Sequence, residues 1–240
     1  MGMRPAYASF AAFLLSCAPF PLLAGPAGTR VVGKVTLNGS LAKPKPFDLS
    51  KEPACARIHA ADPLFPETVL TGPGNSLRNV VVYISTGAPY PGPVPSTPVL
   101  FDQQGCHYTT HVLVFRVGQE VKISNSDPLS HNIHTLAKVN REWNKIQPPG
   151  TPPFAYSYES EEFIPVKCNI HPWMQGYFAV LRTPYFAVTG DDGDFSLGDL
   201  PPGRYTVTAW HETLGTQSQE IEIRSSGEPQ TLNFTFTVKP

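Results

Sequence analysis

The sequence predicts an all-β protein made of two β-sandwich units. Its 27 prolines and 19 glycines in 240 residues are many for a helical protein and are typical of a chain with frequent turns. Short alternating or β-branched runs recur between turn residues, as half-buried strands require. The pattern changes after Pro184, where strands and tight turns follow one another closely, and this change indicates a second domain.

In the first part of the chain a strand is expected over residues 30–37, followed by an Asn38-Gly39 turn. Residues 44–73 contain scattered proline, aspartate and glycine, which predict irregular structure. Residues 79–85 (NVVVYIS) are apolar throughout and predict a strand buried on both faces. Residues 87–98 hold too many prolines for a central strand, so we expect an exposed connector.

The middle of the chain predicts short strands on both sides of a Val117-Gly118-Gln119 turn, and further strands on both sides of the stretch CNIHPWM. The polar, proline-rich residues 139–159 predict a loop. After Pro184, alternating strands are separated by the turns GDDG and LPPG. The expected strands are 112–115, 120–124, 131–136, 163–167, 176–181, 185–189, 194–197, 204–211, 220–224 and 231–238.

The N-terminus predicts export. Arg4 precedes an apolar run over residues 6–15, and small residues follow, so residues 1–27 are expected to be a signal peptide cleaved near Ala24 or Ala27. The alternative is a lipoprotein signal with a lipid anchor on Cys17. The apolar run is too short and too interrupted by proline to span a bilayer. We therefore expect a protein of the periplasm or cell exterior, without a membrane span.

Charge and motifs exclude several classes of function. With 18 Lys+Arg and 19 Asp+Glu the net charge is −1, which gives no basic excess for nucleic acid. No nucleophile elbow, P-loop or dinucleotide fingerprint is present. We therefore predict a protein that is not an enzyme.

The stretch CNIHPWM carries the most specific chemistry in the chain. It places the Cys168 thiol, the His171 imidazole and the Met174 thioether within seven residues, and thiolate with thioether selects copper. A trigonal His₂Cys site with a weak Met ligand needs a second histidine. His131, in the segment NSDPLSHNIH, is the candidate, and the alternative interpretation is a histidine of the strand core.

Residues 166–176 resemble the ligand loop of cupredoxins, with the C-x₂-H-x₂-M spacing of the amicyanin-like and methylamine-utilisation-like members, and N-x-D-x₃-H-N-x-H resembles the segment that supplies their first histidine. The resemblance covers about residues 99–182. It implies a Greek-key β-sandwich over residues 98–183 that binds one type 1 copper ion. The ligands carried over by position are His131, Cys168, His171 and Met174.

The same resemblance implies supporting roles for neighbouring residues. Asn132 would tie its strand to the ligand loop near Asn169, and Pro172 removes a competing N–H from the turn. Trp173 would cover the site or form an apolar docking patch around an exposed edge of His171, the usual electron port. His134 lies three residues along the strand from His131, so it should face the opposite side and be structural.

Export makes a disulfide between Cys55 and Cys106 the favoured state of these cysteines, and two separate buried thiols are the alternative. His107 and His111 lie near Cys106, and His59 lies near Cys55. These histidines permit a second metal site, or they occupy turns and sheet faces without a metal.

The segment T-x-D-D-G-x-F-x-L, followed by L-P-P-G-x-Y-x-V, resembles the carboxypeptidase regulatory-like, transthyretin-like β-sandwich and related carbohydrate-binding modules. That family has earlier strands, which here match residues 33–35 and 79–84, far upstream. We therefore hypothesise that the copper domain is inserted into a sandwich formed by residues 30–85 and 184–240. The alternative is two sandwiches in series, in which residues 30–85 of the N-terminal β segment 28–97 are extra strands of the copper domain.

Together these features predict an exported blue-copper protein that carries single electrons between redox proteins, such as a cytochrome or a periplasmic oxidoreductase. One alternative is a copper carrier, storage or sensing protein. The other is a carbohydrate-binding or adhesion module with a structural metal.

Overall fold

The computed structural model describes residue 2 and residues 28–88, 92–224 and 228–238. The all-β prediction is confirmed, because strands dominate these residues and the helices are short. The predicted signal peptide and Cys17 lie outside the described residues. No helix within the described ranges has the length and apolar character needed to cross a membrane.

The outer unit, as we name residues 29–38, 69–86 and 184–237, is a sandwich of two sheets. Val31, Val35, Leu197, Val207 and Phe234 are among the side chains buried between them. One sheet contains β1 (Thr29–Asn38), β13 (Asp194–Leu200), β16 (Gln230–Thr231) and β17 (Phe234–Thr237); the other has the order β12 (Phe186–Val188), β2 (Val81–Thr86), β14 (Gly203–His211) and β15 (Gly215–Ile223).

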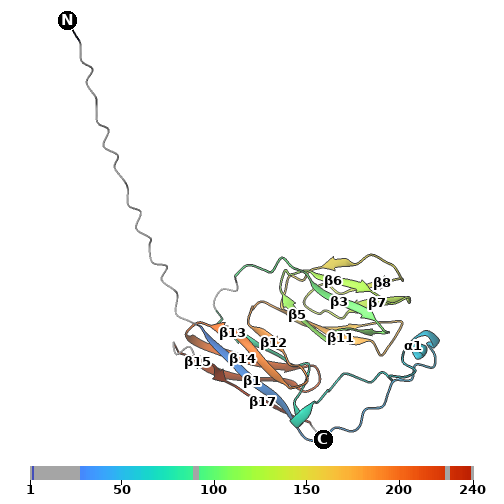
Figure 1. The fold of residues 1–240 in the computed structure, drawn as a ribbon, viewed down its shortest axis with the longest axis horizontal. Helices are drawn as coiled ribbons and strands as arrows, with labels where there is room; N and C mark the ends of the chain where they lie inside the picture. The colour runs from blue at the N-terminus through green and yellow to red at the C-terminus, as the bar shows by residue number, and fades with distance from the viewer. Residues whose placement is uncertain (1, 3–27, 89–91, 225–227, 239–240) are drawn as a thin grey trace.

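Strand β1, near the N-terminus, pairs with strands of the C-terminal segment. It pairs antiparallel with β13, where Val31 faces Leu197, and parallel with β17, where Val35 faces Phe234. In Figure 1 the blue β1 therefore lies among the orange and red strands of the C-terminal segment. The insertion hypothesis predicts this pairing, and we propose on that basis that residues 98–183 are inserted into the outer unit.

The inserted unit, residues 98–183, is a second two-sheet sandwich. Its core contains several aromatic residues, and the ring centroids of Phe101 and Phe178 lie 4.8 Å apart. One sheet has the order β5 (Val112–Arg116), β11 (Gln175–Leu181), β10 (Glu162–Lys167), β7 (His131–Thr135) and β8 (Trp143–Gln147); the other has the order β4 (His107–Tyr108), β3 (Val99–Gln104), β6 (Val121–Asn125) and β9 (Phe154–Tyr156).

Two expectations for connecting segments were wrong. The segment 139–159 is not a loop, since it contains β8 and β9, and the ring of Trp143 packs on that of Phe154 at 5.7 Å. The segment 44–73 is not wholly irregular, because it contains α1 (Pro53–Ile58); a 3₁₀ turn, η1 (Pro73–Asn75), begins at its last residue. Proline disrupts strands and the interior of helices, but Pro53 lies in the first turn of α1, where its fixed φ is favourable.

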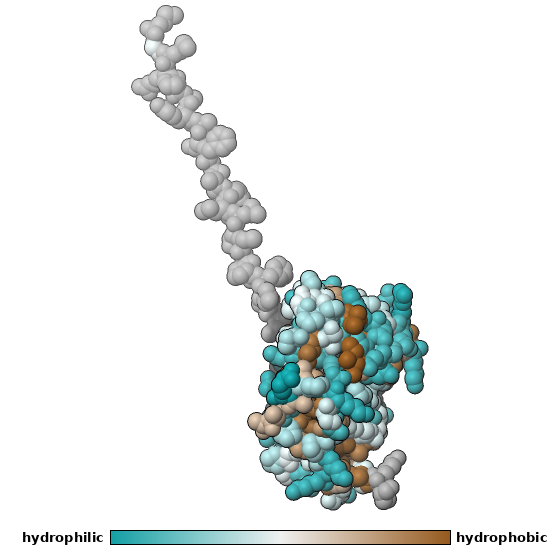
Figure 2. Space-filling view, turned by 90° about the vertical axis from the view of Figure 1, so that its right-hand side faces the viewer, coloured by the Kyte–Doolittle hydropathy of each residue, from teal (hydrophilic) through white to brown (hydrophobic). Residues whose placement is uncertain are grey.

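The two units pack sheet against sheet. Phe163 of β10 stacks on Trp210 of β14 with ring centroids 4.3 Å apart. Around this pair, Val81, Val112 and Leu181 are buried in a small apolar cluster shared by both units. Figure 1 shows the two lobes side by side, and the face in Figure 2 has apolar patches interrupted by hydrophilic side chains. The two sandwiches are therefore joined by a shared apolar contact.

We expect acid to destabilise the outer unit, because His211 is buried at the end of β14. The residue is 1% exposed, and burial lowers its pKa to about 4. Below about pH 6.5 this histidine is protonated in the unfolded chain but stays neutral in the folded chain. The contribution of His211 to the free energy of unfolding is therefore fully present above about pH 6.5 and is lost as the pH falls towards 4. We expect His211→Gln to reduce the loss of unfolding free energy between pH 7.5 and 4.5 by about 2–3 kcal/mol, measured by urea denaturation. Equal losses in both proteins would contradict this assignment.

Candidate metal centre

The stretch CNIHPWM forms the turn between two paired strands. β10 and β11 are antiparallel neighbours up to the pair Lys167 and Gln175. The Cys168 N–H donates to the carbonyl of Met174 at 3.0 Å, and the Met174 N–H donates to the carbonyl of His171 at 2.9 Å. These two hydrogen bonds hold the turn in a compact shape. The candidate ligands of the motif therefore lie close together at one end of the inserted unit.

His131 joins this turn from a neighbouring strand. It is the first residue of β7, which pairs with β10 through His134 and Lys167. Its Nδ1 lies 2.9 Å from Nδ1 of His171, which lies 3.8 Å from Sγ of Cys168. All three donor atoms lie within 4.8 Å of one another, and the three residues are 0%, 3% and 2% exposed.

Met174 ends the turn beside this group. It is 1% exposed and packs in the same apolar cluster as Cys168. The structure therefore brings all four sequence-predicted ligands to one end of the sandwich. The buried donor atoms of His131, His171 and Cys168, with a thioether residue in the same turn, fit the ligand preference of copper.

Asn132 links the two segments. Its Oδ1 accepts the backbone N–H of Asn169 at 2.7 Å and lies 3.3 Å from Sγ of Cys168. The sulfur also accepts the N–H of His171 at 3.4 Å. Asn132 thus occupies the position that the resemblance implied, and hydrogen bonds restrain the sulfur before any metal binds.

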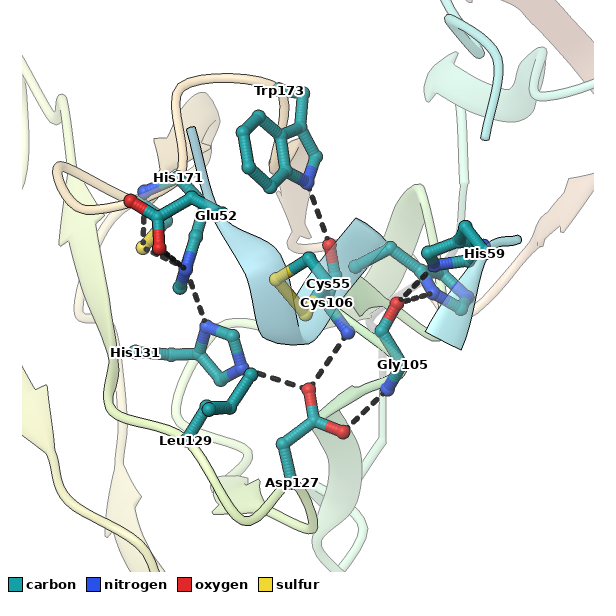
Figure 3. Close-up of a disulfide and its surroundings, with 12 residues drawn as sticks. Glu52, Cys55, His59, Gly105, Cys106, Asp127, Leu129, His131, His171 and Trp173 are labelled. Carbon is teal, nitrogen blue, oxygen red and sulfur yellow. Dashed lines mark hydrogen bonds and ion pairs between the residues drawn. A yellow bond between two sulfur atoms is a disulfide. The ribbon is translucent and has the colours of Figure 1, made fainter. Parts of the chain in front are cut away.

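Asp127 is a functional residue that the sequence interpretation missed. Its carboxylate accepts the Nε2–H of His131 at 2.8 Å, and it also accepts the backbone N–H groups of Gly105 and Cys106 at 2.6 and 2.8 Å (Figure 3). The proton on Nε2 leaves the Nδ1 lone pair of His131 free for a metal. The four-residue spacing from Asp127 to His131 was visible in the motif. The turn that brings the Asp127 carboxylate to the His131 ring was not.

Burial keeps both imidazoles in the form that binds metal. It lowers the pKa of His131, although the hydrogen bond to Asp127 acts in the opposite direction. Burial also lowers the pKa of His171, and the nearby His131 adds to the effect. Neutral rings, the form in which imidazole binds a metal, are therefore favoured near neutral pH.

The disulfide between Cys55 and Cys106 is present, and it fastens a covering segment over the site. We call residues 44–68 the strap. Gly105 and Cys106 both have positive φ, 67° and 55°, and form the two-residue hairpin loop between β3 and β4. Asp127 holds both N–H groups of that loop, so the disulfide anchor and the ligand His131 share one carboxylate (Figure 3).

The expected exposed edge of His171 is wrong. The residue is 3% exposed, and Glu52 of the strap places a carboxylate oxygen 3.9 Å from its Nε2 (Figure 3). Trp173 packs over the site while staying partly exposed: its Nε1–H donates to the carbonyl of Cys106 at 2.9 Å, and its ring lies 5.2 Å from that of His171. The edge of His171 is covered because the strap, which is far from His171 in the sequence, contacts it in the folded chain.

The remaining histidines lie outside this cluster. His134 contacts the side chains of Asn169 at 3.2 Å and Glu142 at 2.8 Å, as expected for a structural residue on the other face of β7. His59 lies 2.7 Å from the carbonyl of Gly105 and braces the strap. His111 faces the outer unit, where its Nε2 contacts Glu212.

Comparisons with solved structures give partial likenesses. A mutant amicyanin in its Cu(I) form is 22% identical, with 42% of this chain and 98% of that chain covered and a TM-score of 0.32. A purple cupredoxin from Nitrosopumilus maritimus is 21% identical, with 35% and 99% covered and a TM-score of 0.30. A copper-containing nitrite reductase from Thermus scotoductus is 18% identical, with 41% and 25% covered and a TM-score of 0.34. No curated protein matches the chain.

The family comparison concerns the other unit. Residues 179–237 match the carboxypeptidase regulatory-like domain. The match spans β12 to β17 and contains the turns and strands from which the sequence predicted this resemblance. The match is limited to the C-terminal part of this all-β chain.

Proposed function

We propose that this protein is an exported, mononuclear type 1 copper protein that carries single electrons between redox proteins. One observation carries the proposal: the imidazoles of His131 and His171 and the thiol of Cys168 converge, buried, with their donor atoms within 4.8 Å of one another. Export, a periplasmic location and a cytochrome or oxidoreductase partner remain parts of the proposal that rest on the sequence.

The bound copper would supply one-electron chemistry between its two oxidation states. The chain's part is to keep the ligand positions constant, because small ligand movement favours fast electron transfer. Asp127 holds the His131 ring, and the N–H of His171 holds the Cys168 sulfur. Both supports come from the folded chain itself, so the ligands are positioned in advance.

The proposal is tested by the optical and paramagnetic-resonance spectra of the full chain after addition of Cu²⁺. We expect one copper per chain and an intense blue band that disappears on reduction and returns on oxidation. The band requires a Cys168 thiolate bound to Cu²⁺. A pale protein with the spectrum of nitrogen and oxygen ligands alone would exclude a type 1 centre.

Met174→Leu tests the axial position. We expect the blue colour to persist, because Cys168, His131 and His171 remain. Loss of the thioether should favour the reduced state and raise the reduction potential by about 60 mV, which for one electron is a tenfold change in the relative binding of the two states. Redox titration followed at the blue band measures the shift, and an unchanged potential would remove Met174 from the ligand set.

A second candidate function, carriage or storage of copper without turnover, is favoured by the covered edge of His171. Electrons and metal ions both have to reach a centre whose ligands are at most 3% exposed. Slow electron exchange with a small soluble oxidant, combined with slow loss of Cu(I) to a chelator, would favour storage. Fast exchange with the strap closed would favour the electron carrier.

A further inference from the structure

His111 occupies a buried junction between three parts of the molecule. It lies between β4 and β5, and its side chain is 6% exposed. Its Nε2–H donates to the carboxylate of Glu212, a residue of the outer unit whose side chain is 7% exposed. Because the proton lies on Nε2, Nδ1 carries a lone pair, and this buried atom has no hydrogen-bond partner among the described residues.

Glu67 of the strap faces that lone pair. Its Oε2 lies 3.6 Å from Nδ1 of His111, which is too far for a hydrogen bond. Both residues line a cavity of about 270 Å³, together with His107. Two acceptor atoms that face each other across such a distance repel one another unless a cation lies between them.

We propose that this junction is a second metal site, which takes a divalent transition-metal ion such as Zn²⁺ through Nδ1 of His111 and the carboxylate of Glu67. With bonds of about 2.1 Å, donors that are 3.6 Å apart subtend an angle of about 120° at the ion, within the range of zinc sites. Imidazole and carboxylate donors suit Zn²⁺ rather than Cu(I). Water would fill the remaining positions from the cavity.

Glu212 acts as the positioning residue of this site. A metal-binding histidine commonly donates its other ring N–H to a carboxylate, which fixes the tautomer and makes the ligand more basic. The contact between His111 and Glu212 has this form. Because the strap, the inserted unit and the outer unit each contribute one of the three side chains, bound metal would hold all three parts together and raise the Tm.

Zinc binding to the full chain tests the proposal, with stoichiometry measured by equilibrium dialysis and stability by the Tm. Glu67→Gln removes a ligand at a half-exposed strap position and is expected to fold. We expect it to bind one Zn²⁺ fewer per chain than the original protein and to lose the zinc-dependent rise in Tm. His111→Ala should behave alike, and Glu212→Gln should weaken the site about tenfold. His134→Ala, which removes an imidazole outside the strap, is the matched control and should leave both readouts unchanged.

The same comparison is made in a Cys168→Ser background, so that the result does not depend on copper. The Glu67→Gln difference should persist there, and Co²⁺ at the second site should add no thiolate absorption. Equal zinc stoichiometry and equal Tm shifts with and without Glu67→Gln would overturn the proposal. A difference that vanishes with Cys168→Ser would place the ion at the first site and also overturn it.

Discussion

Cys168→Ala is expected to abolish the blue absorption completely and to lower copper binding by at least about tenfold. The thiolate is the ligand that produces the intense colour, and the other donors of the site are nitrogen atoms and a thioether. Cys168 is also the single free cysteine among the described residues, so no other described thiol replaces it. Titration with Cu²⁺, followed by absorption and by metal analysis after dialysis, measures both effects.

His134→Ala is the matched control for this experiment. It removes an imidazole from the same strand as His131, but from a position whose contacts are Asn169 and Glu142. We expect unchanged copper content and an unchanged spectrum. Loss of copper from this variant would mean that His134 is a ligand. Persistence of the blue band in Cys168→Ala would refute the ligand set as a whole.

The double substitution of Cys55 and Cys106 by serine is expected to lower the free energy of unfolding by about 4 kcal/mol. The disulfide joins residues 51 positions apart, and a loop of that length restricts the unfolded chain by roughly this amount in the loop-entropy model. Urea unfolding of the double variant measures the loss. Ala56→Ser, in the same short helix, changes size and polarity without breaking the link and should cost much less.

The same double variant has a second expected effect, on access to the metal. The disulfide anchors α1, and the strap brings Glu52 to His171. Release of the strap should expose His171 and speed electron exchange with a small soluble oxidant, while the blue spectrum stays unchanged. A changed spectrum would instead mean that the disulfide shapes the ligand geometry through Asp127, which binds the N–H groups of both Gly105 and Cys106.

The candidate ligands were predictable because their chemistry is local. Cys168, His171 and Met174 lie in one turn, and a turn of seven residues between two strands leaves few arrangements. His131 was predictable because it starts a strand beside β10, and neighbouring strands place their ends together. The strands of the outer unit were predictable from alternation, and their turns from Gly and Asp at defined positions.

The surroundings of the site were not predictable in the same way. No periodicity connects the strap with β7, so neither the contact of Glu52 with His171 nor the closed edge of that ring appears in the local pattern. The strands in residues 139–159 were hidden by neighbouring prolines, although Trp143 packs tightly there. The approach of Glu212 to His111 depends on how two separate sandwiches pack.

The sequence by itself determined the all-β class, the regulatory-like C-terminal domain and the short motif that holds the candidate ligands, because these follow from composition, alternation and spacing over a few residues. Tertiary structure alone decided that β1 closes a sheet with the C-terminal strands, that Asp127 joins the disulfide loop to His131, and that the strap buries His171. The physical reason is that such contacts join residues far apart in the chain, and packing of the whole molecule selects them.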